Sequence, residues 1–295
     1  GQRHGRLYLQ PGPHAQHWLK AGDGTGWGLP ETALRSYPHG MINDTPTAAV
    51  LLIGNEVLSG RTKDKNLGFI ADYLTALGID LLEARVVADD EAAIVEAVNA
   101  LRQRYTYVFT TGGIGPTHDD ITADCIAKAF SVGISHHPEA VAILENYFRE
   151  IGREANEARM RMARIPEGGT LIINKVSRAP GFRIGNVFVM AGVPKIMQAM
   201  MDEVAPTLRR GAQMLSRTLL FEGGEGDIAK PLGAAQDAFP DVVMGSYPFE
   251  GQGGFCTNLV LRSRDAARLD EALSRVRGEA EKLVAEGKAR GVSEV

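Results

Sequence analysis

The stretch from residue 110 to residue 122 reads Thr-Thr-Gly-Gly-Ile-Gly-Pro-Thr-His-Asp-Asp-Ile-Thr and lies between a short apolar run and a helical pattern. Glycine adopts positive φ angles readily and lets a ligand approach the backbone, so such a loop can direct several N–H groups at an anion. The spacing matches neither a Walker A loop nor a Rossmann fingerprint. The loop predicts a phosphate cradle at Gly112, Gly113 and Gly115, and a glycine-rich turn without a ligand is the alternative.

Apolar runs alternate with helical stretches on both sides of this loop, which is typical of βαβ units and a parallel sheet buried on both faces. We expect strands near 48–53, 80–87, 107–111, 170–173 and 187–190, and helices near 67–77, 92–104, 122–130, 140–151, 156–163 and 194–208. A second unit, in the order strand, helix, strand, strand, helix, follows the polar link at 209–213. The predicted fold class is α/β, a three-layer open and mostly parallel sheet, with a second, smaller α+β (βαββα) domain.

The first 46 residues show no apolar period of 2 or 3.6, so they bury too little surface to offset the entropy of ordering. We expect a flexible leader at 1–46, a larger domain at 47–210 and a smaller one at 214–295.

Composition limits the classes of partner. A formal net charge of −4 and scattered Lys and Arg provide no basic surface for nucleic acid. No membrane-spanning run or secretory h-region is visible, and Cys125 and Cys256 fit neither a disulfide framework nor a C-x-x-C metal pattern. We expect a cytoplasmic protein with buried thiols, a small-molecule ligand, no nucleic-acid or membrane partner, and a homo-oligomeric state (dimer or trimer).

Two acidic residues, Asp119 and Asp120, follow the glycines, where they repel a phosphate unless a cation or a proton-transfer role compensates. One of them is expected to cap the next helix, which leaves the other to hold a divalent metal or to orient a nucleophile. Glu56, after the first strand, supplies a third carboxylate at the same sheet edge. The sequence predicts Asp119, Asp120 and Glu56 as catalytic residues, with the metal held by Asp119 and Asp120.

Other loops add polar groups near this edge. Asn66 is interpreted as a helix N-cap unless the ligand reaches it. Ala191-Gly192-Val193-Pro194 is either a second anion site, because its proline suits the first turn of a helix, or a tight turn. Lys175 and Arg178 form an anion rim or are simply solvated.

Taken together, these residues resemble the MoaB/MogA-type molybdopterin-binding domain, in the version found at the amino end of CinA-type competence/damage-inducible proteins and in some eukaryotic FAD synthases. The matching segments are 54–60, 112–122, 179–182, 192–194 and 245–248. The resemblance implies molybdopterin as a ligand and Mg, Mn or Co as a metal. It extends the ligand-binding residues to Gly112, Gly113, Gly115, Pro116, Thr117, His118, Thr122, Asn55, Asn66, Pro180, Gly181, Gly192 and Pro194.

Two activities follow from the resemblance. One is metal-dependent cleavage of the pyrophosphate in ADP-ribose-like or FAD-type dinucleotides, and the other is molybdopterin binding or adenylyl transfer in molybdenum cofactor biosynthesis. The sequence has Ala191 and Ile196 where the family usually has Pro and Glu in a Pro-Gly-Val-Pro-x-Glu-Met pattern, which weakens the case for hydrolysis. The deamidase segment of full CinA proteins does not follow, so nicotinamide mononucleotide deamidation is not expected. A regulatory protein with a vestigial pocket is the third hypothesis.

Overall fold

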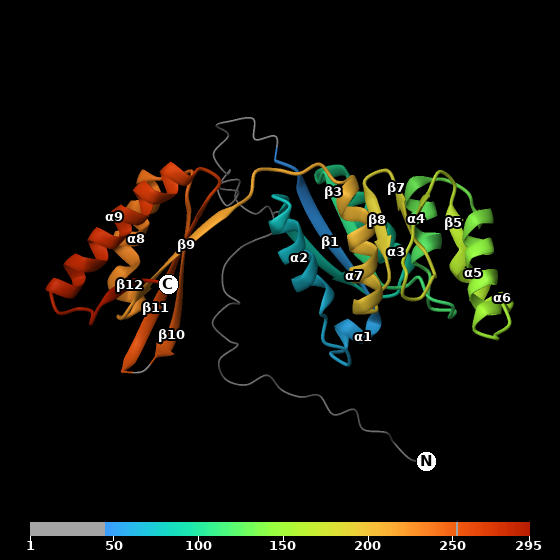
Figure 1. Cartoon of the computed structure of the whole chain (residues 1–295), viewed down its shortest axis with the longest axis horizontal. Helices are drawn as coiled ribbons and strands as arrows, with labels where there is room; N and C mark the ends of the chain where they lie inside the picture. Colours follow the sequence, from blue (N-terminus) through green and yellow to red (C-terminus); the bar gives the residue numbers. More distant parts are fainter. Residues whose placement is uncertain (1–44, 252) are drawn as a thin grey trace, which may run out of the picture. The chain divides into compact units, whose positions relative to one another are not determined.

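The structure, a computed structural model, describes residues 45–251 and 253–295 (Figure 1). The leader predicted at 1–46 falls, up to residue 44, outside the described residues.

The larger α/β part begins at Thr47. Its strands are β1 (Thr47–Ile53), β2 (Asp80–Val87), β3 (Tyr107–Thr111), β4 (Ile134–His136), β5 (Arg164–Pro166), β6 (Thr170–Ile172), β7 (Gly181–Ile184) and β8 (Val187–Met190). Its helices are α1 (Asn55–Leu58), α2 (Asn66–Ala76), α3 (Glu91–Arg104), α4 (Thr122–Phe130), α5 (Pro138–Glu150), α6 (Glu157–Met160) and α7 (Pro194–Val204), with 3₁₀ turns at Arg161–Ala163 and Ala205–Thr207.

Six of these strands form one sheet in the order β2-β1-β3-β8-β7-β6. The pairs β1–β2, β1–β3 and β3–β8 are parallel, whereas β7 runs antiparallel to both of its neighbours. The predicted open, mostly parallel sheet is therefore confirmed. Strand β7 is absent from the predicted strands, because it begins at Gly181 directly after Pro180, and a Pro-Gly pair is typical of a turn.

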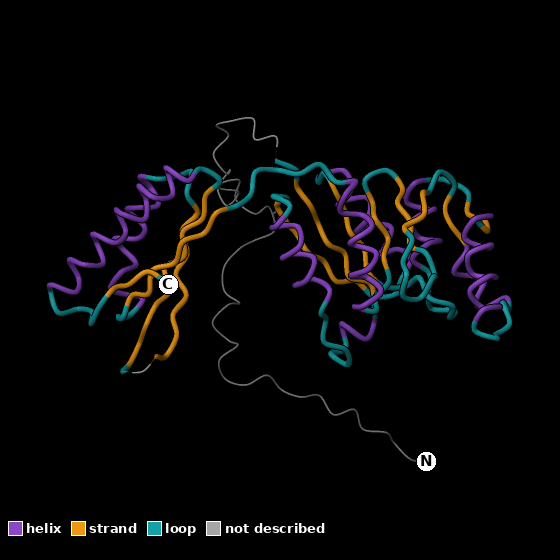
Figure 2. The backbone as a smooth tube through the Cα atoms, in the orientation of Figure 1, coloured by secondary structure: helices purple, strands orange, loops and turns teal. Residues whose placement is uncertain are grey.

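Strand β1 shows why its sequence is apolar without alternation. Ala49, Leu51 and Ile53 pack on the face that α3 and α4 cover, whereas Ala48, Val50 and Leu52 pack with α2 and α7 on the other face. Helices thus flank the sheet on both sides (Figure 2). Because β1, β3 and β8 are parallel neighbours, the loops at their carboxyl ends meet at one edge of the sheet.

One predicted helix is broken. The stretch 156–163 forms only the four-residue helix α6 and the following 3₁₀ turn. The chain then enters β5, which pairs antiparallel with β4 in a separate two-stranded sheet.

The smaller part is an antiparallel sheet covered by helices on one face, which agrees with the predicted α+β class. It contains β9 (Leu215–Phe221), α8 (Glu225–Ala238), β10 (Val243–Gly251), β11 (Gly254–Ser263), α9 (Ala266–Ala285) and β12 (Val292–Glu294), with strand order β10-β11-β9-β12. Leu219, Leu259 and Leu261 point from the strands into the core formed with α8 and α9. The sequence-based order omitted only the short β12.

No helix among the described residues is long and apolar enough to cross a bilayer. Cys125 and Cys256 are both free and buried, which confirms the prediction for the two thiols. Burial raises the pKa of Cys125 to about 12.

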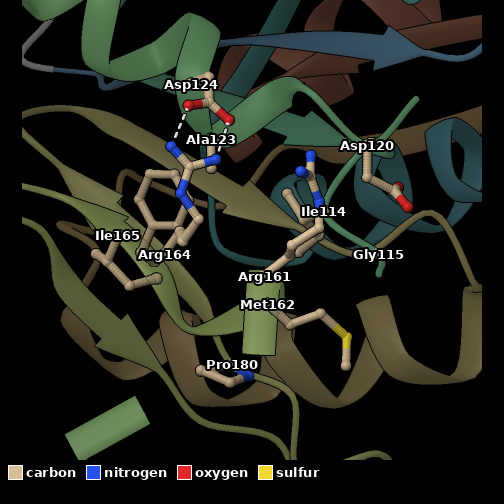
Figure 3. Close-up of a pocket in the computed structure, with 12 residues that line it drawn as sticks. Ile114, Gly115, Asp120, Ala123, Asp124, Arg161, Met162, Arg164, Ile165 and Pro180 are labelled. Atoms are coloured by element: carbon tan, nitrogen blue, oxygen red, sulfur yellow. Dashed lines mark hydrogen bonds and ion pairs between the residues drawn. The ribbon is translucent and has the colours of Figure 1, made fainter. Parts of the chain in front are cut away.

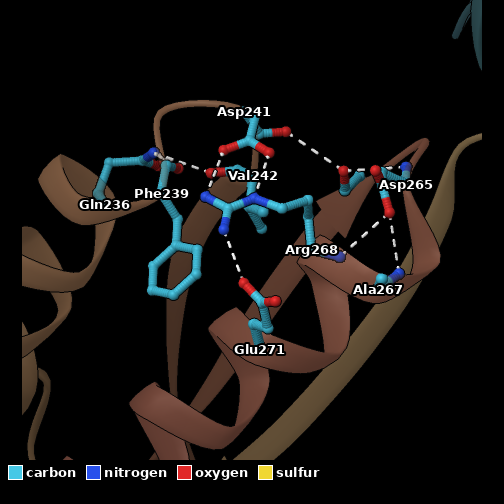
Figure 4. A network of polar contacts seen from close by, with 9 residues as sticks. Gln236, Phe239, Asp241, Val242, Asp265, Ala267, Arg268 and Glu271 are labelled. Carbon is cyan, nitrogen blue, oxygen red and sulfur yellow. Dashed lines mark hydrogen bonds and ion pairs between the residues drawn. The ribbon is translucent and has the colours of Figure 1, made fainter.

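A polar network in the smaller part connects α9 to the loop before β10 (Figure 4). Arg268 donates two hydrogen bonds to Asp241, from Nε to Oδ2 at 2.8 Å and from Nη2 to Oδ1 at 3.1 Å. Its guanidinium also contacts Glu271 and lies 4.7 Å from the centre of the Phe239 ring. These hydrogen bonds from Arg268 hold the pKa of Asp241 below its usual value of 3.8.

Replacing Arg268 by Met is expected to lower the free energy of unfolding only slightly at pH 7, because both partners of the ion pair are partly exposed. The folded-state pKa of Asp241 lies below the unfolded one, so this stabilisation is present above about pH 4 and is lost as pH falls through the folded-state value. Urea unfolding of wild type and R268M at pH 7 and near pH 2.5 checks this. A difference that stays constant with pH would show that packing on Phe239, not charge, connects the two segments.

Candidate functional site

The glycine loop connects β3 to α4 and is packed closely against the end of β1. Gly112 and Gly113 have φ angles of +106° and +67°. A Cβ atom on Gly112 would lie 2.1 Å from the Ile53 carbonyl oxygen, and one on Gly113 would lie 2.1 Å from Thr122 Oγ1. Both the backbone angles and the space therefore require glycine at these two positions.

Thr122 holds the glycine loop in place through two hydrogen bonds. Its hydroxyl is fully buried and donates to the Gly112 carbonyl oxygen at 2.9 Å, and its backbone N–H donates to the Gly113 carbonyl oxygen at 3.0 Å. Thr122 thus stabilises the glycine loop and does not itself line the pocket that the loop borders.

Thr122→Val is expected to lower the free energy of unfolding by about 1–3 kcal/mol, because it leaves the buried Gly112 carbonyl without its hydroxyl donor at nearly unchanged side-chain volume. Thr122→Ser keeps the hydroxyl and serves as the matched control. Chemical denaturation of both variants checks the prediction. Equal stability of the two variants would mean that the hydroxyl does not hold the loop.

The structure corrects the prediction that one of the two aspartates caps helix α4. Helix α4 is preceded by Ile121, and no side chain caps it, so the expected aspartate N-cap is wrong. Asp120 instead accepts hydrogen bonds at Oδ2 from Thr117 N at 2.8 Å and from Thr117 Oγ1 at 2.5 Å. Asp119 is exposed.

The loop forms one wall of a pocket of about 630 Å³. The other walls come from α1, α5, the 3₁₀ turn, the loop before β7, and the start of α7. The lining residues are Glu56, Thr62, Gly112, Gly113, Ile114, Gly115, Pro116, Asp120, Tyr147, Phe148, Met162, Ser177, Ala179, Ala191, Gly192, Val193, Pro194, Ile196 and Met200.

A second, small cavity of about 20 Å³ adjoins this pocket and shares Gly113, Gly115 and Asp120 with it (Figure 3). Two arginines line it. Arg164 forms a bidentate ion pair with Asp124, with N–O distances of 2.8 and 2.6 Å. Arg161 forms no ion pair within the described part of the chain, and its buried Nε has no hydrogen-bond partner there.

Asn66 lies in a third, narrow cavity that Glu56, Gly192 and Pro194 also line. It is the first residue of α2 and not its N-cap, so that interpretation is wrong. Asp64 accepts from the backbone N–H groups of Asn66 and Leu67 in its place. Asn66 Nδ2 donates to the Gly192 carbonyl oxygen at 2.8 Å. The other amide atom, Oδ1, is buried and has no partner among the residues described.

The structure brings most of the predicted site residues together. The large pocket is lined by Glu56, Gly112, Gly113, Gly115, Pro116, Asp120, Gly192 and Pro194, and the two smaller cavities add Pro180 and Asn66. Asn55, Thr117, His118, Asp119, Thr122 and Gly181 line none of these three cavities. Gly181 has a packing role, because a Cβ atom there would lie 2.3 Å from the Val189 carbonyl oxygen.

Sequence reasoning missed the apolar half of the pocket. Tyr147 and Phe148 on α5, with ring centres 5.4 Å apart, and Met162 and Met200 all line it. Apolar residues on an amphipathic helix carry no signal that separates a pocket wall from the core. Ile196, where the family pattern has Glu, also faces the pocket.

The loop before β7 presents other residues than those predicted. Asn174 organises it by accepting from the backbone N–H groups of Val176 and Ser177 at 3.0 and 2.8 Å. The residues that line the pocket are Ser177 and Ala179, whereas the predicted rim cations Lys175 and Arg178 are exposed and line none of the three cavities.

A preformed metal site is not present in the described ranges, where no group of three His, Cys, Asp or Glu side chains could hold a metal ion. Glu56 and Asp120 both line the large pocket, so they are the carboxylates that remain available to a metal that also binds ligand phosphates.

The fold is an α/β sheet whose glycine loop lines a pocket of about 630 Å³. Residues 49–210 match the family described as "Probable molybdopterin binding domain", and the chain belongs to this family. Residues 213–287 match "FAD synthase, middle domain". The resemblance noted from the sequence is thereby confirmed.

Individual relatives agree with this assignment. A protein of Aeropyrum pernix is 32% identical over 86% of this chain and 96% of its own length. A CinA-like protein of Citrifermentans bemidjiense is 37% identical over 78% of this chain, which spans only 57% of that relative. The crystal structure of a CinA protein of unknown function from Thermoplasma acidophilum is 32% identical, covers 55% of this chain and 98% of its own, and superposes with a TM-score of 0.52.

Proposed function

We propose that the chain binds a phosphate-bearing pterin or nucleotide in the pocket of about 630 Å³, with a phosphate on the glycine loop. The observation that carries this proposal is the composition of the pocket wall. Gly112, Gly113 and Gly115 line the same space as the aromatic pair Tyr147 and Phe148. The Gly112 N–H already donates to the Met190 carbonyl oxygen at 3.1 Å, so the N–H groups offered to a ligand are those of Gly113 and Gly115. Backbone N–H groups suit phosphate oxygens and aromatic side chains suit a planar ring, so the pocket fits a ligand that has both.

A binding panel tests the proposal. Isothermal titration calorimetry with AMP, FMN, ADP-ribose, FAD and a phosphorylated pterin should give micromolar or tighter dissociation constants for at least one ligand. Tyr147→Ala should weaken that ligand about tenfold, in the range measured for loss of one stacked aromatic ring. Tyr73→Ala, on α2 outside the pocket, is the matched control and should leave affinity unchanged. A panel without any binder, or equal losses in the two variants, would contradict the proposal.

A second candidate is metal-dependent hydrolysis of the pyrophosphate in such a dinucleotide. It is favoured by Glu56 and Asp120, which both line the pocket. A bound divalent metal would stabilise negative charge on the phosphoryl oxygens. Ile196 argues for binding without turnover, because an apolar side chain faces the pocket where the family pattern has a carboxylate.

A further inference from the structure

We propose that Arg161 is the residue that selects a phosphorylated ligand, by donating to a phosphate oxygen that enters the small cavity beside the glycine loop. The inference rests on the proposed function and names the cation that this function requires. Arg161 begins the 3₁₀ turn Arg161–Ala163 and lines the small cavity together with Gly113, Gly115 and Asp120.

Charge in the large pocket makes such a cation necessary. Its lining includes two carboxylates, Glu56 and Asp120, and no Lys or Arg among the described residues. A phosphate held on the glycine loop would therefore experience net repulsion. Arg161 lines the adjoining small cavity, next to the shared residues Gly115 and Asp120, where its positive charge offsets these carboxylates.

The hydrogen bonds of Arg161 are consistent with a ligand-binding role. Its Nε is buried, and no acceptor in the described ranges reaches it. A buried donor without an acceptor is unfavourable, and more so when it carries charge, so the Arg161 guanidinium is available to a ligand acceptor in a way that a paired arginine is not. The adjoining space of about 20 Å³ holds one water-sized group, which is the size of a single phosphate oxygen.

Arg164 lines the same small cavity, but its guanidinium is already paired within the protein. Both oxygens of Asp124 accept from its guanidinium, so its charge is already neutralised. In Figure 3 dashed lines join Arg164 to Asp124, and none reaches Arg161. Because arginine presents a planar fork of donors that matches phosphate geometry, Arg161 can discriminate by charge and by shape.

The test compares ligands that differ only in the phosphate. Dissociation constants of FMN and riboflavin, and of AMP and adenosine, are measured by calorimetry for wild type, R161M, R161K and R164M. We expect R161M to weaken binding of FMN and AMP about 10- to 100-fold, and of riboflavin and adenosine less than about threefold. R161K, which keeps the charge without the fork, should fall in between. R164M should lower the thermal midpoint and leave the ratio within each ligand pair unchanged.

The outcomes separate this inference from the proposed function. If wild type binds neither pair and no other phosphorylated ligand of the panel, the proposed function is wrong and the role of Arg161 falls with it. If wild type binds FMN or AMP and R161M binds it equally well, only the role of Arg161 is wrong. If R161M weakens both members of a pair equally, Arg161 shapes the pocket without contacting phosphate, and the inference is again overturned.

Discussion

Asp120→Asn is expected to lower metal-dependent hydrolysis of ADP-ribose or FAD by about 100-fold if the chain is an enzyme, equivalent to about 2.7 kcal/mol of transition-state stabilisation. The substitution removes the charge and keeps an oxygen that can still accept from Thr117, so the loop should keep its shape. Affinity for the nucleotide without metal should hold or rise, because one negative charge beside the phosphate is gone. Turnover with Mg²⁺, Mn²⁺ or Co²⁺ is measured, together with affinity in EDTA.

Asp119→Asn is the matched control, because it removes the same charge one residue away, on a side chain that is exposed and does not line the pocket. It should change turnover less than about threefold. Equal losses in the two variants would point to the general charge of the loop and not to a metal at Asp120. Wild-type protein that binds a phosphorylated pterin and hydrolyses no dinucleotide would leave the binding function alone.

Gly113→Ala is expected to weaken ligand binding by about 100-fold and to lower the free energy of unfolding by about 2–4 kcal/mol. About 1–2 kcal/mol comes from placing an L-residue at a left-handed φ angle. The remainder comes from the Cβ atom, which would displace the buried Thr122 hydroxyl from its hydrogen bond with the Gly112 carbonyl oxygen. Calorimetry and chemical denaturation measure the two effects.

Gly152 provides the control for the backbone contribution. Its φ angle of +65° is close to the +67° of Gly113, and a Cβ atom there meets nothing within 4 Å. Gly152→Ala should therefore lose only about 1–2 kcal/mol of stability and no ligand affinity. If Gly113→Ala behaves like Gly152→Ala in both measurements, the loop is a simple turn and the site assignment is wrong.

The fold was predictable where the sequence pattern had one physical cause. Strand β1 is apolar along its length because helices cover both of its faces, and that pattern identifies a buried parallel strand. Strand β7 was missed because Pro180-Gly181 resembles a turn, although the absence of a side chain at Gly181 lets the strand pack closely against the Val189 carbonyl oxygen. The stretch 156–163 has helical spacing, yet its second half forms a 3₁₀ turn that leads into β5.

The loops that form the site were predictable from the sequence, whereas the contacts of individual side chains were not. Glycines and carboxylates that follow parallel strands indicate a ligand edge from the sequence alone, and Glu56, Gly113 and Asp120 do line one pocket. The role of Asn66 depends on a carbonyl 126 residues away, at Gly192, which no local pattern reveals. Arg161 lacks the acidic partner that Arg164 has in Asp124, and this difference is visible only in the three-dimensional structure.

The close contact between Gly112 and the Ile53 carbonyl oxygen has a consequence for how the family can diversify. A lineage that acquires a different ligand cannot do so by placing a side chain at position 112, because that side chain would collide with the end of β1. We expect changes of ligand to arise instead at side chains that line the rest of the pocket, such as Tyr147, Met162 and Ile196. Under the proposed function, descendants of one ancestor should therefore keep the glycine loop that binds the phosphate and exchange the rest of the molecule that they recognise.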